Sequence, residues 1–170
     1  TSWATAADSI QNAVNAADPG DTIYVGAGVW QEAINVYDNN LSLLGMGTDS
    51  TIFENYSGTT IRLWNDTTII EGFSFISDRE TDAISCAYWG FIEVKNNYFN
   101  SVFAGVGGNL SGIIKNNYFE DCREALRVVA IRDSMVFENN TIYDNFRFSP
   151  ILIDDLMQDS SKCHIRKNII

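Results

Sequence analysis

Acidic side chains alternate in the stretch SDRETD, where Asp78, Glu80 and Asp82 occupy every second position. Residues two apart in an extended strand point to the same side, so these three carboxylates would share one face. Two carboxylates about 5–10 Å apart serve glycosidases as acid and base, and the same oxygens suit Ca²⁺. Because Arg79 lies among them, we interpret the stretch first as a solvated turn, with calcium binding and catalysis as alternatives.

Other residues that bind metals are few. His164 is the only histidine, which excludes a histidine-rich copper or iron site. The three cysteines, Cys86, Cys122 and Cys163, form no CxxC pair and indicate neither a zinc site nor a disulfide framework. Cys163 falls at an inward position of its strand, so we predict a buried thiol and no disulfide. We predict no catalytic residue and no cofactor beyond the calcium alternative.

Composition limits the partners of the chain. Its 170 residues carry 22 acidic and 11 basic side chains, for a net charge of −11, and 45% of the residues are hydrophobic. Such a chain is long enough for one domain with a sizeable core. Its charge repels nucleic acid and anionic lipid, and no apolar run approaches the ~20 residues that span a bilayer. We therefore expect no nucleic-acid partner and no membrane span in this chain.

The elements that must position these residues form a repeat. NNYF occurs at 96–99 and again at 116–119, and its flanking pattern recurs in five segments. In each segment an apolar third and last position alternate with a charged fourth position, as in short strands interrupted by a bend. The segments are TIIEGFSF (68–75), IEVKNNYF (92–99), GIIKNNYF (112–119), MVFENNTI (135–142) and CHIRKNII (163–170). Short strands with this spacing, and without room for a helix, indicate a parallel β-helix.

Asparagine fills the sixth position of the last four segments. Asparagine tolerates the left-handed backbone of a tight bend, and its amide both donates and accepts hydrogen bonds. Coils that stack ~4.8 Å apart would place these amides above one another in a hydrogen-bonded ladder. The predicted ladder consists of Asn97, Asn117, Asn140 and Asn168. The functional alternative is a binding surface formed by the asparagine pairs at 96–97 and 116–117.

The beginning of the chain differs from the repeat. ADSIQNAVNAAD at 7–18 places its apolar residues on one helical face, with Asp8 or Ser9 as the N-cap. We predict a helix over residues 9–17 that covers the first coil, because a solenoid must protect its open end. The chain is then a single domain over 1–170, with an N-terminal cap over 1–20 and coils over 21–170.

Four N-x-S/T sequons mark candidate glycosylation sites. They begin at Asn55, Asn65, Asn109 and Asn139. Asn55 and Asn65 stand in turn-like surroundings, which favours them as acceptors in a secreted protein from a glycosylating cell.

The segment 1–36, together with NLSLLGMG at 40–47, resembles the opening of right-handed parallel β-helix proteins of the pectate-lyase-like superfamily. The later NNYF, ENNTIY and RKNII segments are similar to the repeats of that superfamily. The resemblance implies an all-β solenoid of about 6–7 coils, found in secreted and cell-surface proteins. GVWQE at 28–32 is similar to a structural stretch of pectin methylesterases. The catalytic motifs of methylesterases, polygalacturonases and pectate lyases are absent, and one fold hosts many activities.

Two classes of function therefore stay open. The first is an extracellular or cell-surface scaffold of sheath, fibre, S-layer-like or adhesive type. Because RKNII stops within a repeat, we expect self-association there or continuation into further coils. The second is a carbohydrate-active enzyme, a lyase or hydrolase, or a carbohydrate-binding β-helix, with Trp64 or Trp89 lining a glycan groove. The net charge of −11 opposes binding of acidic polysaccharide, so we expect the scaffold rather than the enzyme.

Overall fold

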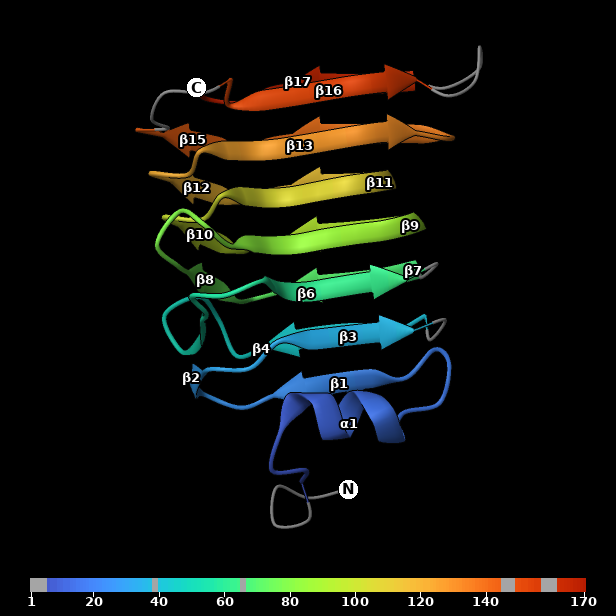
Figure 1. Ribbon diagram of the computed structural model, residues 1–170, viewed down its shortest axis with the longest axis vertical. Helices are drawn as coiled ribbons and strands as arrows, with labels where there is room; N and C mark the ends of the chain where they lie inside the picture. Colours follow the sequence, from blue (N-terminus) through green and yellow to red (C-terminus); the bar gives the residue numbers. More distant parts are fainter. Residues whose placement is uncertain (1–5, 38–39, 65–66, 145–148, 157–161) are drawn as a thin grey trace.

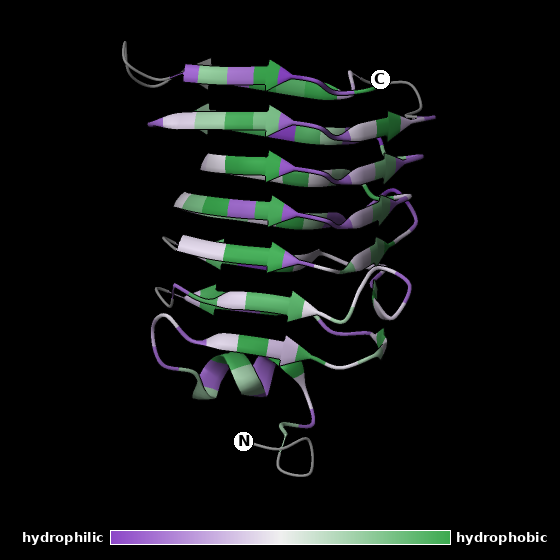
Figure 2. Ribbon diagram, turned by 180° about the vertical axis from the view of Figure 1, so that it is seen from behind, coloured by the Kyte–Doolittle hydropathy of each residue, from purple (hydrophilic) through white to green (hydrophobic). Residues whose placement is uncertain are grey.

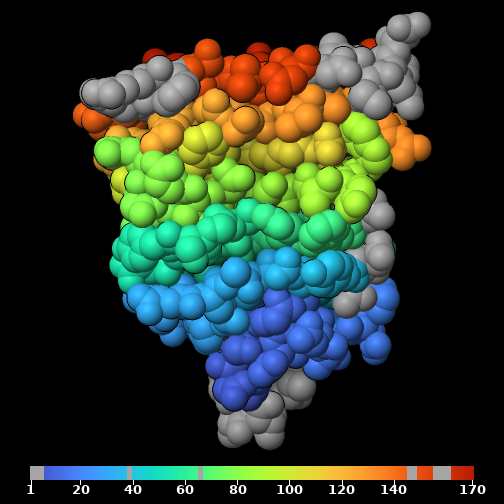
Figure 3. Space-filling view, viewed as in Figure 1, coloured from blue at the N-terminus to red at the C-terminus, as the bar shows by residue number. Residues whose placement is uncertain are grey.

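The protein is a parallel β-solenoid with one short helix, as the sequence predicts. The computed structural model describes residues 6–37, 40–64, 67–144, 149–156 and 162–170. Figure 1 shows the coils stacked along one long axis, with the two ends of the chain at opposite ends of the stack. Figure 3 shows the same order as successive bands of colour on the surface. No helix among the described residues is long and apolar enough to cross a membrane.

Each coil contributes strands to three faces, A, B and C, and every paired strand is parallel to its neighbour. Face A stacks β1 (Thr22–Val25), β4 (Ser42–Gly45), β7 (Thr67–Glu71), the second halves of β9 (Asp82–Lys95) and β11 (Ala104–Lys115), β14 (Ser134–Glu138) and β17 (Lys162–Arg166). Face B stacks β2 (Gly28–Trp30), β5 (Thr51–Glu54), β8 (Ser74–Ile76), β10 (Tyr98–Asn100), β12 (Tyr118–Glu120) and β15 (Thr141–Tyr143). Face C stacks β3 (Ile34–Tyr37), β6 (Thr59–Trp64), the first halves of β9 and β11, β13 (Glu124–Ile131) and β16 (Ile151–Leu156).

The core follows from the alternation of side chains along each strand. Phe53, Phe75, Phe99 and Phe119 take the inward position of face B and stack with ring centroids 5.4, 5.0 and 4.6 Å apart. Figure 2 shows hydrophobic and hydrophilic positions alternating along the strands. Each of these rings is buried, which contributes roughly 1.5–3 kcal/mol per side chain.

The bend from face A to face B uses two adjacent residues for two tasks. The first residue adopts the left-handed conformation, with φ of 55° at Asn96 and 57° at Asn116. The second residue turns inward and forms the ladder: the Nδ2 of Asn97 donates to the Oδ1 of Asn117 at 3.2 Å. Asn117 repeats this contact to the next coil at 3.1 Å, as does Asn140 at 3.2 Å. The four asparagines chosen from the sequence thus form one continuous ladder, which ends at Asn168.

Helix α1 (Ile10–Ala16) closes the first coil, as Figure 1 shows. Ser9 is its N-cap, since its Oγ accepts from the N–H of Asn12 at 3.1 Å. The side chain of Gln11 accepts from the backbone N–H of Asn35 at 2.7 Å and donates to the carbonyl of the same residue at 3.1 Å. Gln11 therefore satisfies backbone groups at the edge of face C that would otherwise lack a partner.

None of the three cysteines, all of which lie among the described residues, forms a disulfide, in agreement with the prediction. Cys86 and Cys122 are buried, but Cys163 is only half-buried, so the prediction of its burial was wrong. Its strand β17 stacks on β14, where Met135 is the partner of Cys163. No described strand covers the other side of β17, which leaves the inward row of this coil partly open.

Candidate functional site

The SDRETD stretch forms a turn rather than a shared carboxylate face. Asp78 accepts the N–H of Glu80 at 3.2 Å, and the Glu80 carboxylate pairs with Arg123. Arg79 adopts φ 72°, which breaks the extended run on which the alternation argument depends. Among the described residues no three His, Cys, Asp or Glu side chains come together as a metal site requires, so the calcium interpretation of Asp78, Glu80 and Asp82 finds no geometric support.

A carboxylate pair that sequence reasoning missed lies on face C. Glu124 is the register partner of Ala104 on β11, and Asp82 lies on β9, the strand on the other side of β11, close enough for its charge to act on Glu124. Burial raises the pKa of both carboxyl groups, and Arg127, whose Nε lies 3.5 Å from Glu124, opposes the shift. A raised pKa would suit a general acid. However, Ala104 is only 1% exposed and Glu124 only 7%, so these residues offer little surface to a sugar ring.

The corner between faces A and B carries an open groove. Two adjoining depressions of about 580 and 430 Å³ share Thr48 and Asn96, and together they pass along β1, β4, β7, β9 and β11. The loop 46–50 forms one wall, and the Ser74 hydroxyl, which donates to the carbonyl of Thr48 at 2.6 Å, anchors it. The groove is lined by Tyr24, Leu44, Gly45, Met46, Gly47, Thr48, Asp49, Glu71, Gly72, Asn96, Asn97, Tyr98, Asn116 and Tyr118.

The floor of the groove consists of the left-handed bend residues. Asn96 and Asn116 are exposed because their left-handed conformation directs them outward, whereas the ladder asparagines behind them are buried. The amide of Asn96 donates to the Oε1 of Glu71 at 2.8 Å. The second asparagine of each NN pair thus forms the ladder, and the first is exposed on the groove, where the binding surface expected as the alternative would lie.

Two tyrosines form the other wall. Tyr98 and Tyr118 lie on neighbouring strands of face B, with ring centroids 5.8 Å apart, and Tyr118 is 39% exposed. The Tyr98 hydroxyl donates to the carboxylate of Glu120 and accepts from the amide of Asn100 at 2.9 Å. Burial and the Glu120 contact raise the pKa of Tyr98 to about 12, which keeps its proton in place. Rings beside amides and hydroxyls suit a ligand with both apolar faces and polar edges.

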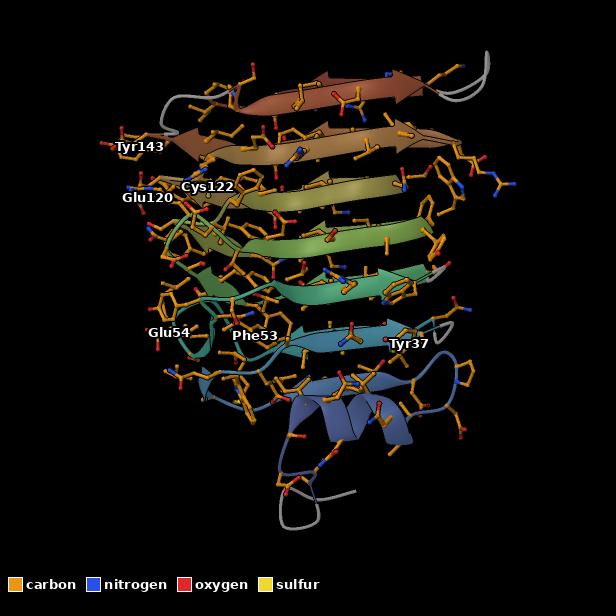
Figure 4. The ribbon with its side chains drawn as sticks, in the orientation of Figure 1. Tyr37, Phe53, Glu54, Glu120, Cys122 and Tyr143 are labelled. Atoms are coloured by element: carbon orange, nitrogen blue, oxygen red, sulfur yellow. The ribbon has the colours of Figure 1, made fainter. Side chains whose placement is uncertain are left out.

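The tryptophans proposed from the sequence as sugar-stacking residues do not line this groove. Trp64 stacks on Tyr37 at 5.6 Å and contacts Tyr88 at 5.4 Å, on face C. Figure 4 shows Tyr37 at the end of its strand far from Glu120, which projects from the face B side. Trp89 is likewise absent from the lining of both depressions. The tyrosine of each NNYF segment, Tyr98 or Tyr118, lines the groove. The sequence pattern identifies this tyrosine only as part of the repeat and does not predict its place in a groove.

The sequon asparagines differ in accessibility. Asn139 is exposed in a left-handed bend with φ 54°. Asn55 and Asn109 are half-buried, and their amides donate to the Thr60 hydroxyl at 3.3 Å and to the Ala87 carbonyl at 3.4 Å. Asn65 lies outside the described residues. Of the three sequon asparagines that the structure describes, Asn139 rather than Asn55 is the most exposed.

Comparison with known proteins finds similarity only to solved structures at low identity. No family model and no curated protein matches the chain. A substituted pectin methylesterase in complex with hexasaccharide IV is similar at 11% identity and a TM-score of 0.47, covering 92% of this chain and 64% of that one. Pectin methylesterase in complex with hexasaccharide VII is similar at 11% identity and a TM-score of 0.42, with the same coverage. This chain thus spans less than two thirds of the length of those two structures.

Proposed function

We propose that this protein is a rigid β-solenoid module that binds a polysaccharide chain in the groove between faces A and B, outside the cell or at its surface. The observation that carries the proposal is the repetition of polar groups along the groove. Asn96 and Asn116 recur one coil apart, and so do Tyr98 and Tyr118. The spacing of stacked coils, ~4.8 Å, is close to the advance of one sugar in an extended β-linked glycan.

The chemistry of the groove favours binding over bond cleavage. Its lining contains two carboxylates, those of Asp49 and Glu71. Glu71 is held by Lys95 at 3.3 Å and by the amide of Asn96 at 2.8 Å. Hydrolysis of a glycoside requires an acid and a base that flank one bond, and Glu71 is already engaged by the two partners just named. The scaffold role expected from the sequence remains part of the proposal, because the ladder and the ring stack hold the groove in one shape.

The test uses replacements that the solenoid already accommodates at equivalent positions. Asn96→Gly copies Gly72 of the preceding coil, which has φ 81°, and Tyr118→Thr copies Thr141 of the following coil. The double variant should keep its fold and lose about five- to tenfold in affinity, equivalent to ~1–1.4 kcal/mol of hydrogen bonds and ring contact. Affinity electrophoresis in gels containing β-glucan, xylan or galactomannan measures the loss.

The matched control makes the same two kinds of change outside the groove. Asn139→Gly with Tyr143→Thr alters an exposed left-handed asparagine and an exposed tyrosine that line neither depression. This variant should bind as the unmodified protein does. Equal weakening in both double variants would place the binding site elsewhere, and a protein that no polysaccharide retards would refute the proposed function.

A further inference from the structure

We infer that the groove selects glycans that carry amino groups, such as polymers of glucosamine, over glycans that carry carboxylate or sulfate groups. This inference rests on the proposed function and names the class of polysaccharide. It follows from the partners of the charged side chains near the groove. These side chains form three groups: lysines in ion pairs, carboxylates that accept hydrogen bonds, and the carboxylate of Asp49, which has no partner among the described residues.

The lysines beside the groove floor are already occupied. The Nζ of Lys95 lies 3.3 Å from Glu71 and 3.2 Å from Glu93, and the Nζ of Lys115 lies 3.2 Å from the same Glu93 oxygen. All four side chains are at most one third exposed. An anionic sugar could recruit either lysine only by taking it from a carboxylate, which would leave that carboxylate unpaired.

Carboxylates are in excess around the same groove. Asp49 is exposed on the wall loop and makes no ion pair or hydrogen bond with any described residue. Glu120 accepts hydrogen bonds from Tyr98 and Asn100 but has no cationic partner among the described side chains. The chain as a whole carries −11. The local and the global field therefore have the same sign, which repels polyanions and attracts a cationic chain.

The size of the selectivity follows from the exposure of these groups. An exposed ion pair contributes roughly 0.2–1 kcal/mol and weakens with salt. One ammonium group beside Asp49 is thus worth up to about fivefold in affinity, and further ammonium groups along the chain add through the general field. The neutral sugar contacts with asparagine and tyrosine remain in either case.

The experiment compares a hexamer of β-1,4-linked glucosamine with the same hexamer N-acetylated, which differs from it mainly in charge, and adds a hexamer of galacturonate as a polyanion. Isothermal titration calorimetry measures the affinity for each hexamer at a mildly acidic pH, where the sugar amines are protonated. We expect the glucosamine hexamer to bind about three- to tenfold more tightly than the acetylated one at low salt, and the preference to shrink as salt is added. The galacturonate hexamer should bind most weakly.

Asp49→Asn should reduce the preference for the glucosamine hexamer about two- to fivefold and leave the acetylated hexamer unaffected. Asp144→Asn is the matched control, because it removes the same charge from an exposed, left-handed residue at the opposite corner of face B. Equal affinity for the charged and neutral hexamers, or tighter binding of galacturonate, would overturn the inference and leave the proposed function standing. Binding of none of the three hexamers would overturn the inference, and the proposed function would fall with it only if no polysaccharide retards the protein in the electrophoresis either.

Discussion

At the residue scale, each NN pair separates a structural task from a surface task. The left-handed Asn116 faces the groove. The Nδ2 of its neighbour Asn117 donates to the next amide of the ladder and to the carbonyl oxygen of Val94, at 2.9 Å. The Oδ1 of Asn117 also accepts the backbone N–H of Asn97 at 3.0 Å. A residue that serves two neighbouring coils in this way cannot be exchanged for an apolar one without leaving buried groups unpaired.

Asn117→Ala should accordingly lower the free energy of unfolding by roughly 1–3 kcal/mol, because the N–H of Asn97 and the carbonyl of Val94 lose their partners. Asn116→Gly should cost well under 1 kcal/mol, since glycine accepts the left-handed bend and the side chain of Asn116 makes no hydrogen bond with any described residue. Urea denaturation of both variants measures the difference. Similar losses of stability would show that the ladder does not carry the energy assigned to it.

The buried carboxyl of Glu124 predicts a pH dependence. Burial raises its pKa in the folded state, and the nearby charge of Asp82 adds to this effect. The stability associated with protonated Glu124 is present below the unfolded-state pKa and is lost as pH rises through the folded-state pKa. Glu124→Gln should therefore stabilise the protein near neutral pH, and the gain should vanish below about pH 4.

Urea titrations at both pH values measure this effect, with Asp144→Asn as a control for the change in net charge. A gain that is equally large at both pH values would show that ionisation of Glu124 is not its origin.

At the element scale, the cap and the corners decide how the coils close. Strands β9 and β11 continue through the corner from face C to face A, and Gly112 makes this bend with φ 127°. A Cβ at Gly112 would lie 2.0 Å from the carbonyl oxygen of Ile92, so no other residue fits there without a shift of the backbone. At the first coil, α1 performs the covering that a further coil performs elsewhere.

Gln11→Ala tests that role of α1. The change leaves the N–H and carbonyl of Asn35 without their side-chain partners, and it should lower the free energy of unfolding by about 1–2 kcal/mol. Gln31→Ala is the control, because Gln31 is exposed and its amide contacts only the Glu54 carboxylate, at 3.1 Å. It should cost less than about 0.5 kcal/mol. Equal melting temperatures for the two variants would contradict the role of Gln11 in covering the edge of face C.

At the scale of the whole molecule, the access of solvent and reagents to a side chain depends on whether coils pack on both sides of it. Cys86 and Cys122 lie between coils, whereas Cys163 lies on the last described strand. Figure 4 shows Cys122 inside the stack, while Glu120 and Tyr143 project from it. In a solenoid each coil contacts only its neighbours, so the coil packed on one side opens most readily.

Alkylation with iodoacetamide should therefore modify Cys163 in the native protein, and Cys86 and Cys122 only after unfolding. Burial raises the pKa of Cys122 to about 12, which also lowers its reactive thiolate fraction. Peptide mass spectrometry of native and urea-treated samples counts the modified thiols. Native labelling of Cys122 at a rate similar to that of Cys163 would contradict uniform packing of the central coils.

The sequence by itself determined the features that one period of the chain encodes. The alternation around Phe99 and Phe119 and the asparagine bend before each of them recur along the chain, so they can be predicted from the residues alone. The capping helix lies outside the repeat, but its amphipathic pattern is also local and can be predicted in the same way. Only the tertiary structure decided which residues from different periods meet. The approach of Glu124 to Asp82 and the partnership of Gln11 with Asn35 depend on the register between coils and on the path of each connecting segment. The groove depends in addition on the position of the loop 46–50, and the repeated pattern of the chain does not encode the position of this loop.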